Sequence, residues 1–252
     1  MRLLVINPNI SEDVTRLIER EALRSAAPAT EVVLATARHG FEYIETRFES
    51  LVAAGAVAEL VAEHHGQVDG VLVAAFGDPG IPALKEISDV PLMGITEAAL
   101  CAAALQGQRI AVVAISDRIT AWYRDCIDRF GLGSRVVSIR SIKEALGGIG
   151  AVQDDFQDVL VDLAGAAVSE DGADVVILAG APLAGLARNV RGLIPVPVVD
   201  GIAAGVRMLE AVCGLDGGGH RAGSFAAPPP KPRRMLPPAL DAALTTLQKG
   251  AR

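Results

Sequence analysis

The feature that most constrains this chain is a series of short, uninterrupted apolar segments separated by amphipathic stretches. A strand with one face in water alternates apolar and polar residues, whereas a strand buried on both faces of a parallel sheet is apolar throughout. The apolar segments are therefore predicted to be strands of parallel sheets. They span residues 3–6, 31–35, 70–75, 91–94, 109–115, 135–139, 174–179 and 197–199.

The stretches between these strands have the periodicity of helices. Apolar residues three and four positions apart give a helix one apolar face, which packs on a sheet. Ser11 is placed to cap the first helix, because a serine hydroxyl accepts a backbone N–H of the first turn. Strands that alternate with helices predict an α/β, doubly wound parallel-sheet fold. The main predicted helices span residues 11–25, 48–64, 117–130, 154–169 and 202–212.

The chain also repeats itself. The segment VDGVLVAAFGDPGIPALKEISDVPLMGITEAALCAA resembles ADVVILAGAPLAGLARNVRGLIPVPVVDGIAAGVRM, and the alignment sets Asp69 on Asp174. After one inserted residue it sets Pro91 on Pro197. RLLVINPNIS resembles RIAVVAISDR, and these two segments come in the same order as the first pair. The repeat predicts two pseudo-symmetric lobes.

The predicted first lobe holds residues 1–95, joined by about 201–215, and the second lobe holds residues 96–200. The remainder, residues 216–252, is rich in glycine and proline and is expected to form an extended tail. A short helix is predicted near its end, at residues 238–248.

Composition argues against several classes of protein. A net charge of −7 and 4% aromatic residues disfavour a nucleic-acid surface, an anionic-membrane surface and a platform for base stacking. The chain starts directly with the strand-like MRLLVIN and carries no recognisable leader or spanning segment, so the cytoplasm is expected. Cys101, Cys126 and Cys213 are scattered among apolar residues, and we expect them to be buried within helices as small hydrophobes.

Ligands of open parallel sheets bind beyond the carboxyl ends of the strands. With two matching lobes, these ends converge on one cleft that presents equivalent groups to both faces of a substrate carbon. Racemisation requires this arrangement, because one group removes a proton and another returns it from the opposite side. The sequence contains no metal-ligand spacing and no nucleotide-binding glycine motif, so neither a metal nor another cofactor is expected.

Three motifs carry a resemblance to a known family: NPNIS before the first helix, AFGDPG after the third strand, and VPVVDG near the end. At this spacing they resemble the aspartate/glutamate/hydantoin racemase superfamily, and most closely its hydantoin and allantoin racemases. The resemblance runs from residue 2 to about residue 212. It implies a cofactor-independent racemase or isomerase, or a decarboxylase, that acts on small carboxylates or cyclic ureides, and a homo-oligomer.

The sequence departs from this family where the racemases carry a cysteine at the end of each lobe's third strand. The resemblance sets these positions at Ala75 and Gly180, which have no thiol. Three explanations are open: Ala75 is a replacement for a native cysteine, a natural branch has lost both thiols and uses another acid/base group, or the protein binds a small anion without catalysis. A decarboxylase or lyase that needs one such group is the alternative enzyme.

Candidate substitutes for the thiols are Asp78, His39 and Asp200. Asp78 and Asp200 follow strand ends, and each could equally cap the next helix. His39 lies in the loop after the second strand, which approaches the cleft in the family, and histidine suits proton transfer near neutral pH. It could equally be a solvated loop residue.

Substrate contacts are expected from residues at the strand ends. Backbone N–H groups at a helix N-terminus, as in Asn7-Pro8-Asn9, suit a carboxylate. The resemblance implies that Asn9 and its counterpart Ser116 hold a carboxylate or ureide carbonyl. Three further contacts are expected beside the vacated positions, and these residues are Phe76, Ala181 and Pro182.

Overall fold

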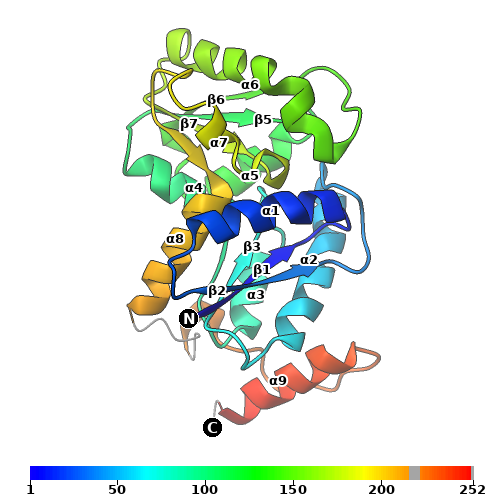
Figure 1. Ribbon diagram of the computed structural model, residues 1–252. Helices are drawn as coiled ribbons and strands as arrows, with labels where there is room; N and C mark the ends of the chain where they lie inside the picture. Colours follow the sequence, from blue (N-terminus) through cyan, green and yellow to red (C-terminus); the bar gives the residue numbers. More distant parts are fainter. Residues whose placement is uncertain (216–221, 251–252) are drawn as a thin grey trace.

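The computed structural model describes residues 1–215 and 222–250. Two four-stranded parallel sheets form its framework, one with strand order β2-β1-β3-β4 and the other with order β6-β5-β7-β8 (Figure 1). The central strands are buried apart from Arg2 at the start of β1, as their uninterrupted apolar runs predict. The strands are β1 (Arg2–Asn7), β2 (Glu31–Thr36), β3 (Gly70–Val73), β4 (Leu92–Gly94), β5 (Ile110–Ala114), β6 (Val136–Ser141), β7 (Val175–Ala179) and β8 (Val198–Asp200).

Helices flank both sheets, and the predicted α/β fold is confirmed. Ser11 caps α1 through its hydroxyl, as predicted. The helix predicted from residue 117 begins three residues later, because Ser116 and Asp117 first form a turn. The helices are α1 (Glu12–Ser25), α2 (Arg47–Glu63), α3 (Ile81–Ile87), α4 (Ile95–Ala104), α5 (Thr120–Arg129), α6 (Val152–Ser169), α7 (Leu186–Asn189), α8 (Gly201–Gly214) and α9 (Pro238–Gly250).

The sequence repeat corresponds to a structural one. Asp69 accepts the backbone N–H of Arg2 at the start of β1 (2.7 Å), and Asp174 accepts that of Arg109 before β5 (2.9 Å). The backbone N–H of each aspartate donates in return to the carbonyl of the same arginine, at 2.8 Å in both lobes. The alignment of Asp69 with Asp174 therefore describes two equivalent contacts.

Strand register supports the inserted residue as well. Val71 of β3 pairs with Leu92 of β4, and Val176 of β7 pairs with Val198 of β8. The chain between the second pair is one residue longer, as the sequence alignment requires.

Helices α4 and α8 contact each other and lie where the two sheets approach (Figure 1). Helix α8 also packs against helix α1, against strand β3 of the first sheet, and against strands β7 and β8 of the second sheet. Gly205 allows its close approach to β3, because a Cβ atom there would come within 2.7 Å of Leu72. One apolar core consequently extends across both sheets.

The cysteines differ partly from expectation. Cys126 of α5 is buried, but Cys101 is exposed on α4, and Cys213 is half-buried at the penultimate position of α8. The expectation of three buried cysteines was wrong for these two, because apolar neighbours in sequence do not determine which helix face meets the core. All three thiols are free.

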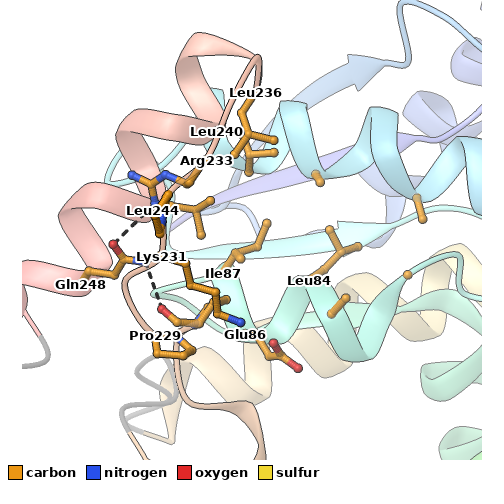
Figure 2. A pocket seen from close by; sticks show the side chains of 16 residues that line it. Leu84, Glu86, Ile87, Pro229, Lys231, Arg233, Leu236, Leu240, Leu244 and Gln248 are labelled. Atoms are coloured by element: carbon orange, nitrogen blue, oxygen red, sulfur yellow. Dashed lines mark hydrogen bonds between the residues drawn. The ribbon is translucent and has the colours of Figure 1, made fainter.

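The tail returns along the first lobe, where α9 packs against α2 and α3 (Figure 1). A groove of about 440 Å³ remains between α3 and the tail, with leucines on both sides (Figure 2). Gln248 links α9 to the extended segment that precedes it, because its side-chain amide donates to the carbonyl of Pro228 (3.0 Å). The last described element of the tail is helix α9.

Candidate active site

A small cavity lies between the carboxyl ends of the strands of both sheets. Its volume is about 30 Å³, enough for a water molecule or two. Residues from both lobes line it: Asn9, Tyr43, Ile44, Ala74, Ala75, Phe76, Ile115, Ile119, Tyr123, Ile149, Gly180, Ala181 and Pro182. Among the described residues, none that lines the cavity carries a thiol or a carboxylate.

Ala75 and Gly180 both line this cavity, although 105 positions separate them in sequence. Ala75 follows β3 and Gly180 follows β7, which are equivalent strands of the two sheets. Gly180 has a φ of +122°, a conformation in which a side chain is strained. Ala75 and Gly180 thus follow equivalent strands, but the backbone at Gly180 adopts a conformation that disfavours a side chain.

The loop that carries Ala75 is held from three directions. The N–H of Gly77 donates to Thr96 Oγ1 (2.6 Å), and the thiol of Cys126 donates to the Gly77 carbonyl (2.8 Å). Gly77 has a φ of +105°, and a Cβ atom there would overlap the ring of Trp122. Position 77 therefore requires glycine. Burial raises the pKa of the Cys126 thiol to about 12, so this thiol stays protonated.

Asp78 is completely buried but does not line the cavity. Its two carboxylate oxygens accept the backbone N–H groups of Thr96 and Glu97, both at 2.9 Å, and so cap α4. Burial raises its pKa to about 7, an effect that outweighs these donors. The structure gives Asp78 a capping contact, which was the structural alternative to catalysis.

Asp200 caps α8 in the second lobe. Its carboxylate accepts N–H groups from Ile202 (2.8 Å), Ala203 (3.0 Å) and Gly185 (2.6 Å). Burial raises its pKa to about 6. Asp200 lies outside the lining of the cavity.

His39 is exposed in the loop that follows β2. Its Nε2 atom lies 3.4 Å from Glu59 Oε1 of α2. The histidine is not among the residues that line the cavity. The structure thus places none of the three candidate substitutes in direct contact with that space.

The Asn7-Pro8-Asn9 segment forms a buried hydrogen-bond network. The amide group of Asn7 donates to Asn9 Oδ1 (3.0 Å) and to Thr15 Oγ1 (2.9 Å). Asn9 Oδ1 also accepts the backbone N–H of Ser11 (2.9 Å). Asn9 lines the cavity, and its Nδ2 atom has no hydrogen-bond partner within the described part of the chain. Asn7 and Pro8 lie behind it and do not line the space.

The other expected contacts divide into two groups. Phe76, Ala181 and Pro182 line the cavity, whereas Ser116 does not. The hydroxyl of Ser116 accepts the N–H of Arg118 (3.2 Å) and so belongs to the turn before α5.

Sequence reasoning missed six apolar or aromatic residues of the lining: Tyr43, Ile44, Ala74, Ile119, Tyr123 and Ile149. Tyr123 is the most buried tyrosine and packs on Phe76 with ring centroids 4.6 Å apart. A hydroxyl on the apolar face of the predicted helix at 117–130 was the signal that could have identified it.

Two negative findings apply to residues 1–215 and 222–250. No helix there is long and apolar enough to cross a membrane. These residues also contain no cluster of three or more metal-ligating side chains. What the cavity offers is hydrogen bonding from neutral groups in an apolar space.

The fold and this site define a class: two-lobed α/β proteins that place a small-molecule cavity between matching parallel sheets. A family model described as Asp/Glu/Hydantoin racemase matches residues 3–209. The chain belongs to this racemase family.

Related proteins cover nearly the whole chain. A hydantoin racemase of Paenarthrobacter aurescens is 31% identical over 235 residues, which are 92% of this chain and 99% of that protein. The structure of allantoin racemase from Klebsiella pneumoniae has a TM-score of 0.89 and 30% identity, and covers 95% of this chain and 98% of its own. Allantoin racemase from Pseudomonas fluorescens has a TM-score of 0.87 and 33% identity, with coverage of 94% and 100%.

Proposed function

We propose that the protein acts at an acidic carbon of a small cyclic ureide or carboxylate, and that it does so without a pair of thiols. One observation supports the proposal: Ala75 and Gly180, the positions to which the resemblance assigns the family's cysteines, line the same cavity. The similarity to hydantoin and allantoin racemases supports the cyclic ureide as substrate class.

Hydrogen-bond donors in the cavity support binding of a carbonyl or carboxylate oxygen. Asn9 offers its free Nδ2 group, held in place by the bonds that its Oδ1 atom accepts. The backbone N–H groups of Phe76 and Ala181, one from each lobe, also lack backbone partners within the described residues. Donors from both lobes then fix the orientation of a planar ring.

Ligand pockets usually measure several hundred Å³, so the cavity of about 30 Å³ must open to admit a substrate. Tyr43 and Ile44 come from the loop before α2, and Ile149 comes from the short 3₁₀ turn before α6. We propose that these two segments move apart when the substrate enters.

A second function is favoured by the neutral lining: binding of a small anion without catalysis. Because no carboxylate, histidine or thiol from residues 1–215 and 222–250 lines the space, proton removal has few available bases. A decarboxylase or lyase needs a single proton donor, so its chemical demand on the site lies between that of a racemase and that of a protein that only binds an anion. In all three versions we propose a cytoplasmic homo-oligomer that needs no cofactor.

Deuterium exchange tests the proposal. Allantoin and 5-substituted hydantoins are incubated in D₂O with the protein, and loss of the α-proton signal is followed by NMR. Ala75→Cys and an Ala75→Cys/Gly180→Cys double variant are measured beside it. Exchange by the unaltered protein supports catalysis without paired thiols. Exchange only by the double variant contradicts it and indicates a racemase cavity without its acid/base pair, whereas binding without exchange in all three supports the anion-binding function.

A further inference from the structure

Tyr123 combines three properties that no other residue of the cavity shares. Its side chain is 1% exposed, it lines the cavity, and its hydroxyl has no hydrogen-bond partner within the described residues. The hydroxyl oxygen lies 3.7 Å from the point that a Cβ atom at position 180 would occupy. The phenol therefore reaches the same part of the cavity as a side chain from position 180.

The second tyrosine of the chain provides a comparison. Tyr43 also lines the cavity, but its phenol interacts with the Glu45 side chain, which raises the pKa of Tyr43 in addition to the effect of burial. Tyr123 is a buried residue, but its hydroxyl oxygen is not one of the fully enclosed polar atoms without a partner, so it opens onto the cavity, where a ligand can supply the hydrogen-bond partner. Tyr123 is thus the polar group of this lining whose hydrogen-bonding capacity is wholly unused.

We infer that Tyr123 is the acid/base group of the site and that it exchanges protons with the substrate carbon from the second-lobe side only. The inference rests on the proposed function, because it assigns a residue to that reaction. Ala75 presents a methyl group on the opposite side, and a methyl group exchanges no proton.

The chemical step is a reversible proton transfer at the α-carbon. The phenolate, formed by loss of the hydroxyl proton to hydroxide, takes the α-proton, and the C–H electron pair moves into the adjacent carbonyl to give an enolate. The phenol exchanges its proton with solvent when the cavity is open to water. It then returns a proton or deuteron to the same face of the carbon, and the carbonyl re-forms.

One-sided transfer has a stereochemical consequence. A racemase with a group on each side inverts the carbon when it transfers a solvent proton. A single group returns the proton to the face from which it came. The protein is therefore expected to exchange the α-proton of an optically pure hydantoin at least tenfold faster than it changes the optical rotation.

The surroundings of Tyr123 set the pH dependence. Burial raises the pKa of the phenol, and so do the nearby ionisable groups Cys126 on the same helix, Asp78 behind the Ala75 loop, and Glu45. The phenolate is a minor species at neutral pH. After subtraction of the protein-free rate, exchange should rise about tenfold per pH unit between pH 8 and 9, where the Asp78 carboxyl, with its pKa of about 7, is already largely ionised.

The test compares Tyr123→Phe with Ser88→Ala as the control. Both substitutions remove one hydroxyl from a buried residue, but Ser88 lies at the end of α3 and does not line the cavity. Tyr123→Phe keeps the ring that packs on Phe76. Exchange of optically pure hydantoins in D₂O is measured by NMR, and optical rotation is followed in parallel. Trp122, the single tryptophan, lies with its ring centroid 5.7 Å from that of Tyr123, so its fluorescence reports hydantoin binding independently of activity.

The expected result is at least a hundredfold loss of exchange in Tyr123→Phe with binding retained, and less than a threefold change in Ser88→Ala. Exchange that survives in Tyr123→Phe, or that is accompanied by equal inversion in the unaltered protein, overturns the role of Tyr123 and leaves the proposed function standing. Absence of exchange in the unaltered protein overturns both.

Discussion

The Asp78 carboxyl group lies directly beside Gly94, and its position requires that residue 94 have no side chain. The Asp78 carboxylate reaches the first N–H groups of α4 because Gly94, the residue before that helix, has no side chain. A Cβ atom at Gly94 would overlap the carboxyl group. In the second lobe the equivalent helix, α8, is capped by Asp200, the residue that the sequence repeat aligns with Gly94. The two lobes thus bring a carboxylate to the same helix end from different positions.

Gly94→Ala is expected to lower the free energy of unfolding by at least about 2 kcal/mol, because the methyl group displaces a buried carboxylate. Urea denaturation measures this. Gly55→Ala on α2 is the control, since nothing lies within 4 Å of its Cβ position, and it should stabilise the protein by about 0.5–1 kcal/mol. If the cost of Gly94→Ala is unchanged in an Asp78→Ala background, the two residues are not coupled as described.

Stability is expected to fall as pH rises from about 4 to about 7. Burial raises the pKa of Asp78 to about 7 and of Asp200 to about 6, so the native state binds protons more tightly than the unfolded chain. Each group contributes a slope of up to about 1.4 kcal/mol per pH unit in this window. Asp78→Asn and Asp200→Asn should each flatten the profile measured by denaturation at several pH values. Asp158→Asn, at an exposed position of α6, should leave it unchanged.

Gly180→Ala is expected to destabilise the protein by about 1–3 kcal/mol, although its Cβ position is free of close contacts. The cause is the φ of +122°, which a side chain disfavours. Gly165→Ala, in the middle of α6 and free of neighbours, should instead stabilise by about 0.5–1 kcal/mol. Equal melting temperatures for the two variants would contradict the backbone argument.

Arg188→Ala is expected to cost about 1–3 kcal/mol, because it leaves the buried Glu21 carboxylate without its cation. Arg188 Nε donates to both oxygens of Glu21, at 2.9 and 3.0 Å, and joins α7 of the second lobe to α1 of the first. Adding Glu21→Gln should recover part of this loss. Arg2→Ala breaks an exposed pair with Glu31 and should cost less than about 1 kcal/mol by the same denaturation measurement.

The strands and the lobe repeat were predictable because both are local properties of the sequence. Apolar runs mark buried parallel strands, and Asp69 and Asp174 occupy equivalent places in the repeat and make the same contacts. The ends of elements were less predictable. Residues 74 and 75 continue the apolar run of β3, and the Ala74 N–H still donates to Ile6 of β1 (2.8 Å). From Ala75 the chain leaves the sheet in a turn closed by the Asp78 N–H and the Ala75 carbonyl.

The site was predictable only where the chain order determines it. Strand ends brought Asn9, Ala75 and Gly180 to one cavity, because parallel strands share an edge. Tyr123 was not found in this way, since it lies on a helix and reaches the cavity through the packing of α5 on Phe76. His39 faces Glu59 instead, and nothing local in the sequence specifies the direction of its loop.

The backbone conformation at Gly180 determines which side of the cavity can more easily acquire a new side chain. A lineage with this structure gains a new side chain at Ala75 by one replacement, because that position has an ordinary conformation. At position 180 the same gain requires the turn to refold first, since every residue other than glycine is strained at a φ of +122°. Evolution from this protein, in nature or in a mutant library, is therefore expected to add function on the first-lobe side of the cavity before the second.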